Sequence, residues 1–118
     1  MINLNNFVVP LNSTLLESAN IINESKTRAC VVVEKDLKVV GILSEGDILR
    51  AILNDVSLKS EIKSLINTNF YFVDKNEINQ KKIEELFQMK NVTLIPVIDE
   101  NMKLVDVLTL NEYLRDLK

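Results

Sequence analysis

The 118-residue chain contains no histidine and only one cysteine. Histidine is the usual general base near neutral pH and the commonest metal ligand, so its absence disfavours a stand-alone enzyme and a metal site. A lone cysteine cannot form an internal disulfide. Because Cys30 lies in the apolar run ACVVV, we expect a buried structural thiol rather than a reactive one.

Long hydrophobic runs are missing as well. No apolar stretch approaches the ~18 residues that a membrane-spanning helix needs, and the start, MINLNNFVVP, lacks the positive flank and long apolar stretch of a signal peptide. The net charge of −3 comes from acids and bases mixed along the chain, whereas nucleic-acid-binding proteins concentrate basic side chains on one face. We therefore expect one cytoplasmic domain without a membrane or nucleic-acid partner.

The chain contains an internal repeat at an offset of 65 residues. The stretch VVVEKDLKVVGILSEGDILRAIL, residues 31–53, aligns without a gap with PVIDENMKLVDVLTLNEYLRDLK, residues 96–118. An apolar triplet, an acidic turn, a second apolar run and a polar helix start follow one another in both copies. Such self-similarity indicates one structural unit that is used twice.

The apolar pattern gives each unit the order strand, helix, strand, strand, helix. The first unit covers residues 1–58 and the second residues 59–118. The expected strands are 7–9, 30–33 and 39–43 in the first unit and 70–73, 94–98 and 104–108 in the second. Thr14 and Glu17 form a predicted capping box for the first helix. Neither unit alone has enough apolar surface to close a core, so we predict an α+β fold in which the units pack on each other.

Ser44 and Asp47, at the start of the second helix, have two interpretations. As a capping box, the Ser44 oxygen accepts a helix N–H and Asp47 reaches back to the cap N–H, and the second unit carries the same pattern. As half of a binding site, the helix N-terminus and the Ser44 hydroxyl favour a phosphate, while the Asp47 carboxylate accepts hydrogen bonds from a ribose diol. Capping does not require that Gly41 and Gly46, the only glycines, both lie in this stretch.

Two short motifs carry a resemblance to a known family. GILSEGD, residues 41–47, fits the pattern G-h-h-S/T-x-x-D, in which h is apolar, and LIPVID, residues 94–99, resembles an h-P-V-h-D strand. Over nearly its whole length the chain resembles a tandem pair of CBS domains, called a Bateman module. The resemblance implies two β-α-β-β-α repeats that pack face to face with pseudo-two-fold symmetry. It also implies clefts between the repeats that bind an adenine nucleotide such as AMP, ADP or ATP.

The resemblance assigns ligand-binding roles by position. One of the two clefts matches the family pattern and is called the better cleft. The residues assigned to it are Arg28, Gly41, Ser44, Asp47, Asn69, Tyr71, Thr93 and Leu94. Arg28 stands where the family can place a basic side chain that binds phosphate, and Tyr71 and Leu94 would enclose the adenine. The alternative interpretations are a solvated charge for Arg28 and plain core packing for the other two. No metal and no cofactor beyond the regulatory nucleotide are expected.

The second cleft, with Thr109 and Glu112, departs from the family pattern. Asp106 replaces the glycine and places another anion near any phosphate, and the glutamate is one methylene longer than the usual aspartate. We therefore expect this cleft to bind weakly or not at all. Leu37 and Met102 stand where the family usually has a turn glycine, which predicts two exposed apolar side chains at the hairpins.

These features leave two functions. The first is a regulatory module that senses an adenine nucleotide and modulates an attached domain. The second is a ligand-free structural module that forms a homodimer through its helices. LSEGDILRAIL and the following VSLKSEI resemble pairs at the N-terminus of sugar-phosphate nucleotidyltransferases, which implies such a domain as a partner. A catalytic function of the chain itself is disfavoured, because it has no P-loop and because Asp47 and Glu112, its conceivable acid/base pair, occupy capping positions.

Overall fold

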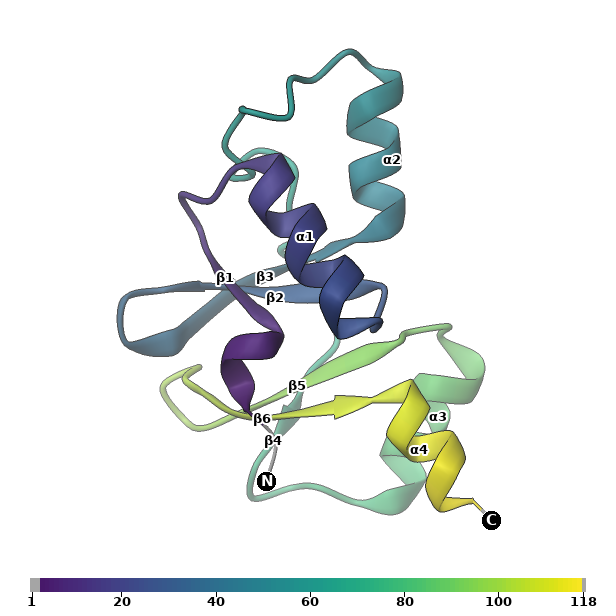
Figure 1. The fold of residues 1–118 in the computed structure, drawn as a ribbon. Coiled ribbons are helices and arrows are strands. Elements are labelled where there is room, and N and C mark those ends of the chain that lie inside the picture. The colour runs from purple at the N-terminus through teal and green to yellow at the C-terminus, as the bar shows by residue number, and fades with distance from the viewer. Residues whose placement is uncertain (1–2, 118) are drawn as a thin grey trace.

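Two three-stranded sheets form the centre of the computed structural model, which describes residues 3–117 (Figure 1). The first sheet has the order β1-β2-β3 and the second the order β4-β5-β6. The strands are β1 (Val8–Pro10), β2 (Ala29–Glu34), β3 (Lys38–Ser44), β4 (Val73–Asp74), β5 (Leu94–Ile98) and β6 (Leu104–Thr109). The helices are α1 (Leu15–Ser25), α2 (Glu45–Leu53), α3 (Gln80–Met89) and α4 (Leu110–Asp116), with 3₁₀ turns at Leu4–Asn6 and Lys35–Leu37. The predicted order β-α-β-β-α is thus confirmed in both repeats.

The two sheets have the same topology, and their antiparallel ladders share one register. In each sheet the first strand pairs in parallel with the second, and the second pairs antiparallel with the third. Ala29 pairs with Ser44 in repeat one, and Leu94 pairs with Thr109 in repeat two. A register shift interrupts both antiparallel ladders at equivalent steps, Val32–Val33 and Val97–Ile98. Residues that lie 65 positions apart in the sequence therefore occupy equivalent places in the two antiparallel ladders.

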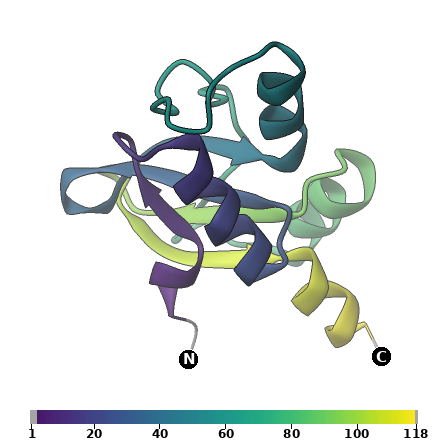
Figure 2. The same cartoon turned by 45° about the horizontal axis from the view of Figure 1, so that its top comes forward.

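Alternation along β2 divides its side chains between two cores, because successive residues of a strand point to opposite faces. Cys30 and Val32 pack on the helix side with Leu15, Ile22, Leu43, Ile48 and Ala51. Ala29, Val31 and Val33 pack on the other side with residues of the second sheet, namely Leu94, Ile98, Leu104 and Val107. Figure 1 shows α1 and α2 beyond the first sheet and α3 and α4 beside the second, and in the tilted view of Figure 2 the strands of both sheets lie between α2 and α4. The cluster shared by the sheets therefore holds the repeats face to face.

The hairpins of the two repeats also meet. Leu37 and Met102 have positive φ values of 61° and 63°, in the left-handed region that favours glycine. Both side chains are half-buried and pack against the cluster between the sheets, and the backbone N–H of Val39 donates to the carbonyl oxygen of Met102 at 2.9 Å. The predicted exposure of the two side chains is wrong, because the neighbouring repeat covers each hairpin.

The linker between the repeats, residues 54–72, runs along the free edge of β3. Ile62 is fully buried in the core of repeat one, and Ile42 and Asn67 exchange two backbone hydrogen bonds of 3.0 and 2.9 Å. The strand predicted at 70–73 is shorter than expected, because only Val73 and Asp74 pair with β5. Within the described residues, no helix has the length and apolar character needed to cross a membrane.

Candidate functional site

A reciprocal capping box begins α2. The Ser44 hydroxyl accepts a hydrogen bond from the backbone N–H of Asp47 at 3.2 Å, and the Asp47 Oδ2 atom accepts from the backbone N–H of Ser44 at 2.9 Å. The Ser44 hydroxyl also donates to Oδ2, at 3.0 Å. The capping interpretation is thus confirmed, and it fixes the Asp47 carboxylate at the N-terminus of the helix.

The second carboxylate oxygen of Asp47 is held by Arg50. The Arg50 Nη2 atom donates to Oδ1 at 2.7 Å. The guanidinium folds back over the first turn of α2, where Nη1 lies 3.3 Å from the position that a Cβ atom on Gly46 would take. Glycine at this position therefore leaves room for a cation beside the helix N-terminus. The Arg50 side chain is 69% exposed and the Asp47 side chain 19%.

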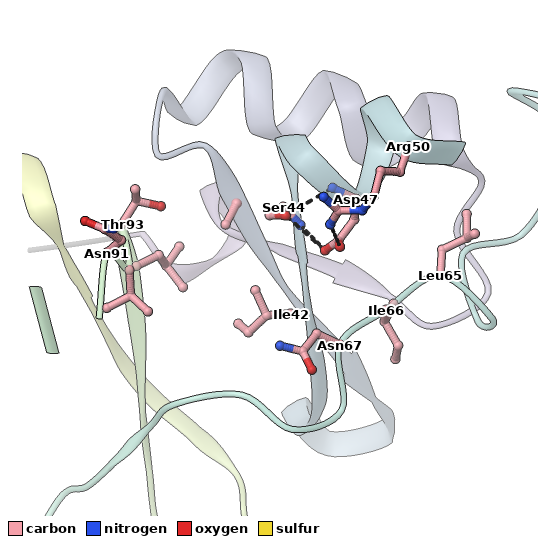
Figure 3. Close-up of a pocket in the computed structure, with 12 residues that line it drawn as sticks. Ile42, Ser44, Asp47, Arg50, Leu65, Ile66, Asn67, Asn91 and Thr93 are labelled. Atoms are coloured by element: carbon pink, nitrogen blue, oxygen red, sulfur yellow. Dashed lines mark hydrogen bonds and ion pairs between the residues drawn. The ribbon is translucent and has the colours of Figure 1, made fainter. Parts of the chain in front are cut away.

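A cavity of about 550 Å³ opens between the repeats at this point (Figure 3). Three segments line it: Ala29, Ile42, Ser44, Asp47 and Arg50 of repeat one; Leu65, Ile66 and Asn67 of the linker; and Asn91, Val92, Thr93 and Leu94 of repeat two. The volume falls within the range of roughly 300–1,000 Å³ typical of small-molecule sites. Apolar walls with a few convergent polar groups are also typical of such sites.

The linker wall of the cavity depends on Gly41. A Cβ atom at this position would lie 2.8 Å from Ile66 Cδ1 and 2.9 Å from the carbonyl oxygen of Asn67. Gly41 is buried beneath the linker and does not line the cavity itself. Its role is to let the backbone of the linker approach β3 closely, which is a known use of glycine within a strand.

The structure brings four of the eight residues assigned to the better cleft into one cavity: Ser44, Asp47, Thr93 and Leu94. Arg28 lines a neighbouring cavity of about 250 Å³ with Lys26, Thr27, Thr93, Leu110 and Asn111. Thr93 thus borders both cavities. Asn69 and Tyr71 do not line the larger cavity, and the Tyr71 side chain is 47% exposed.

Sequence reasoning missed three polar residues of the cavity, which are Arg50, Asn67 and Asn91. A signal was available for Arg50, because an acid and a base three positions apart on a helix are neighbours. The glycine within β3 indicated a close approach of backbone, although not which segment makes it. Asn91 follows α3 and has a φ of 55°, a conformation that asparagine tolerates better than most residues.

The comparison with known families decides the identity of the fold. The family model described as CBS domain matches residues 2–54 and 62–118, nearly the whole chain. The chain belongs to the CBS domain family. Its two repeats are therefore a CBS pair, and the cavity lies between the two CBS domains.

Solved structures share this CBS-pair fold. A CBS domain pair/ACT domain protein from Thermotoga maritima superposes with a TM-score of 0.78 at 22% identity, over 98% of this chain and 91% of that one. A CBS domain protein from Pyrobaculum aerophilum, complexed with AMP, superposes with a TM-score of 0.75 at 23% identity, over 90% and 81% of the two chains. At this level of identity the likeness shows the fold alone.

A relative in sequence is longer than the CBS pair. An uncharacterised protein of Rickettsia prowazekii is 28% identical over 91 residues, which are 77% of this chain and 28% of that protein. The CBS pair thus spans little more than a quarter of the relative's length.

The helix start of the second CBS domain repeats the cap around Asp47 but, within residues 3–117, not its ion pair. Thr109 caps α4 and accepts from the backbone N–H of Glu112 at 3.3 Å, and its hydroxyl lies 3.2 Å from Glu112 Oε1. Asp106 is exposed, and its Oδ1 accepts from the backbone N–H of Val107 at 2.8 Å. Neither Thr109 nor Glu112 lines the larger cavity or the one beside Arg28. Weak binding at the second cleft stays a prediction.

Proposed function

We propose that this CBS pair is a regulatory module that binds an adenine nucleotide of the AMP, ADP or ATP class between its two domains. One observation carries the proposal: a cavity of ligand size that is lined by Ser44 and Asp47 of one domain and by Thr93 and Leu94 of the other. The complex of a CBS protein of similar fold with AMP supports the choice of ligand.

The parts of the cavity match the parts of a nucleotide. The Asp47 carboxylate is an acceptor suited to a ribose diol, and the start of α2 with the Ser44 hydroxyl favours the phosphate end. Apolar side chains on three walls, those of Ile42, Ile66 and Leu94, offer a surface of low polarity to the flat faces of the base. A ligand in this position touches both domains and the linker at once.

Contact with both domains is what makes regulation feasible. A ligand shifts an equilibrium between two arrangements only by the difference in its affinity for them. Because the cavity walls come from both repeats and from the linker, any change in the packing of the repeats changes the site. The nucleotide thereby favours one arrangement of the pair and transmits this preference to an attached domain.

The regulated domain lies outside this CBS pair in our proposal. The relative from Rickettsia prowazekii is much longer than the region it shares with the chain. The resemblance of the region around α2 to nucleotidyltransferase-linked pairs makes a nucleotidyltransferase our proposed partner domain, in a cytoplasmic protein. The CBS pair itself then has a regulatory and not a catalytic role.

Titration calorimetry with AMP, ADP, ATP and S-adenosylmethionine tests the proposed site. We expect heat of binding with at least one of the three nucleotides, and an affinity lower by roughly tenfold or more in Asp47→Asn, because a charged hydrogen-bond acceptor is lost. Glu17→Gln is the matched control, since Glu17 closes the capping box of α1 at 2.9 Å and lies outside the cavity. Absence of heat with all three nucleotides, or an unchanged affinity in Asp47→Asn, would overturn the site.

A homodimer is the second candidate function, favoured by the apolar side chains that the helices expose. Leu49 and Leu53 on α2 are 58% and 73% exposed, and Met89 and Leu114 are 76% and 50% exposed. Sedimentation analysis of the double variant Leu49→Lys/Leu53→Lys tests this surface. We expect a wild-type dimer that the double variant dissociates, whereas Leu58→Lys, an exposed leucine of the linker, leaves the dimer intact. A monomeric wild type would exclude this function.

A further inference from the structure

The ion pair between Asp47 and Arg50 distinguishes the two otherwise matching helix starts. At the equivalent places of repeat two stand Glu112 and Arg115, and within residues 3–117 no ion pair joins them. Gly46, which leaves room for the guanidinium over the first helical turn, corresponds to Asn111. The Asn111 side chain instead donates to the carbonyl oxygen of Lys26 at 3.5 Å. Of these two helix starts, α2 is the one that pairs its first-turn carboxylate with an arginine in the described part of the chain, and α2 also borders the larger cavity.

Both oxygens of the Asp47 carboxylate are already engaged by the protein. Oδ2 accepts from Ser44 through two contacts of 2.9 and 3.0 Å, and these belong to the helix cap. Oδ1 accepts from Arg50. A carboxylate oxygen accepts about two hydrogen bonds, so Oδ2 is fully used by Ser44 and Oδ1 has one acceptor position left. A ribose diol, which donates two hydrogen bonds, therefore needs the position that Arg50 holds, whereas a single hydroxyl does not.

The Arg50 side chain is the partner that can leave. Its side chain is 69% exposed. Near the cavity the guanidinium pairs with Asp47 and lies above Gly46, which has no side chain to hold it. Releasing it opens no hole in the core. However, release separates a charged pair beside a cavity, which costs free energy unless the guanidinium finds another anion.

We propose that Arg50 determines the specificity of the cleft and selects anionic ligands over neutral ones of the same base and sugar. This inference rests on the function proposed above. A neutral nucleoside takes the place of Arg50 at Asp47 and leaves the guanidinium without an anion. A phosphorylated ligand takes the same place and also supplies a phosphate, to which a guanidinium donates two parallel hydrogen bonds. The Arg50 guanidinium lies at Asp47 and over the first turn of α2 (Figure 3). The freed cation is therefore near the start of this helix, which is the proposed phosphate end.

Calorimetric titration of AMP and adenosine into wild type, Arg50→Gln and Arg115→Gln tests the inference. In wild type we expect AMP to bind more tightly than adenosine. In Arg50→Gln the affinity for AMP should fall by roughly tenfold or more, while the affinity for adenosine is unchanged or higher because Asp47 is already free. Arg50→Lys keeps the charge without the planar fork and should retain part of the preference. Arg115→Gln, at the equivalent place in repeat two, should change neither affinity.

The outcomes separate this inference from the proposed function. If Arg50→Gln alters both affinities by the same factor, or alters neither, the role of Arg50 is overturned while nucleotide binding stands. A wild type that prefers adenosine has the same consequence. If wild type binds neither compound, the proposed function falls and the role of Arg50 falls with it. Melting temperatures verify that the variants are folded, which the exposure of both arginines leads us to expect.

Discussion

Gly41 on β3 lies directly beneath Ile66 of the linker, so close that a Cβ atom on the glycine would stand 2.8 Å from the Cδ1 atom of the isoleucine. Its φ angle is not positive, so the requirement for glycine here is one of space and not of backbone conformation. The contact brings the linker onto the edge of the first sheet, and the linker then forms one wall of the cavity.

Gly41→Ala should destabilise the fold and weaken ligand binding together. The added methyl group meets linker backbone, since the carbonyl oxygen of Asn67 would be 2.9 Å away, and the two hydrogen bonds between Ile42 and Asn67 are strained as a result. Overpacking of this kind costs about 1–3 kcal/mol, which urea denaturation measures.

Gly46→Ala is the control for this substitution. Its Cβ atom would meet the end of the flexible Arg50 side chain at 3.3 Å, and alanine favours helix over glycine by roughly 0.8–1 kcal/mol. We expect an unchanged or higher free energy of unfolding. An equal loss of stability in both variants would contradict the role assigned to Gly41.

Cys30 should be inert toward thiol reagents in the folded protein. Its side chain is fully buried in the core of repeat one, and burial raises the pKa of the thiol to about 12. The thiolate is the reactive species, so at pH 8 an aromatic disulfide reagent should react slowly with native protein and stoichiometrically after denaturation. Fast reaction of the native protein, at a rate near that of free cysteine, would show that the core opens readily.

Glu17 should give the stability a dependence on acid pH. The backbone N–H of Thr14, followed by its hydroxyl, holds the pKa of the Glu17 carboxyl below its usual value. A lowered pKa in the folded state stabilises the fold at pH values above the unfolded-state pKa, which is about 4.3 for glutamate. This stabilisation is lost as the pH falls through the folded-state pKa.

The difference in melting temperature between wild type and Glu17→Gln measures this contribution. It should be largest near neutral pH and should shrink to nothing at the acid end of a pH series. A difference that stays constant through this range would mean that the charge of Glu17 is not what closes the cap.

The repeat, the strand order and the helix caps could be predicted because they follow from local patterns. The antiparallel ladders repeat at the offset read from the sequence, and the capping boxes at Thr14 and Ser44 are formed as predicted. These features depend on residues close together in the chain. That the repeats pack on each other was predictable because neither can bury its apolar side chains alone, and the face-to-face arrangement followed from the resemblance to CBS pairs.

The linker wall of the cavity was harder to predict. It depends on the backbone pairing of Asn67 with Ile42. The linker sequence around Asn67 has no strong strand pattern that would predict this pairing. Tyr71, which was assigned to the cavity by position, lies beyond the point where the linker leaves β3. The orientation of Arg50 depends on the space above Gly46, and such space becomes evident only when the side chains are placed.

The central claim, that the cleft between the two CBS domains binds an adenine nucleotide, is tested most directly by amide chemical-shift mapping during a titration with AMP. We predict that the largest shifts occur on all three walls of the cavity, including Ser44, Asp47, Asn67 and Thr93. Absence of shifts, or shifts confined to surfaces away from these walls, would contradict the account.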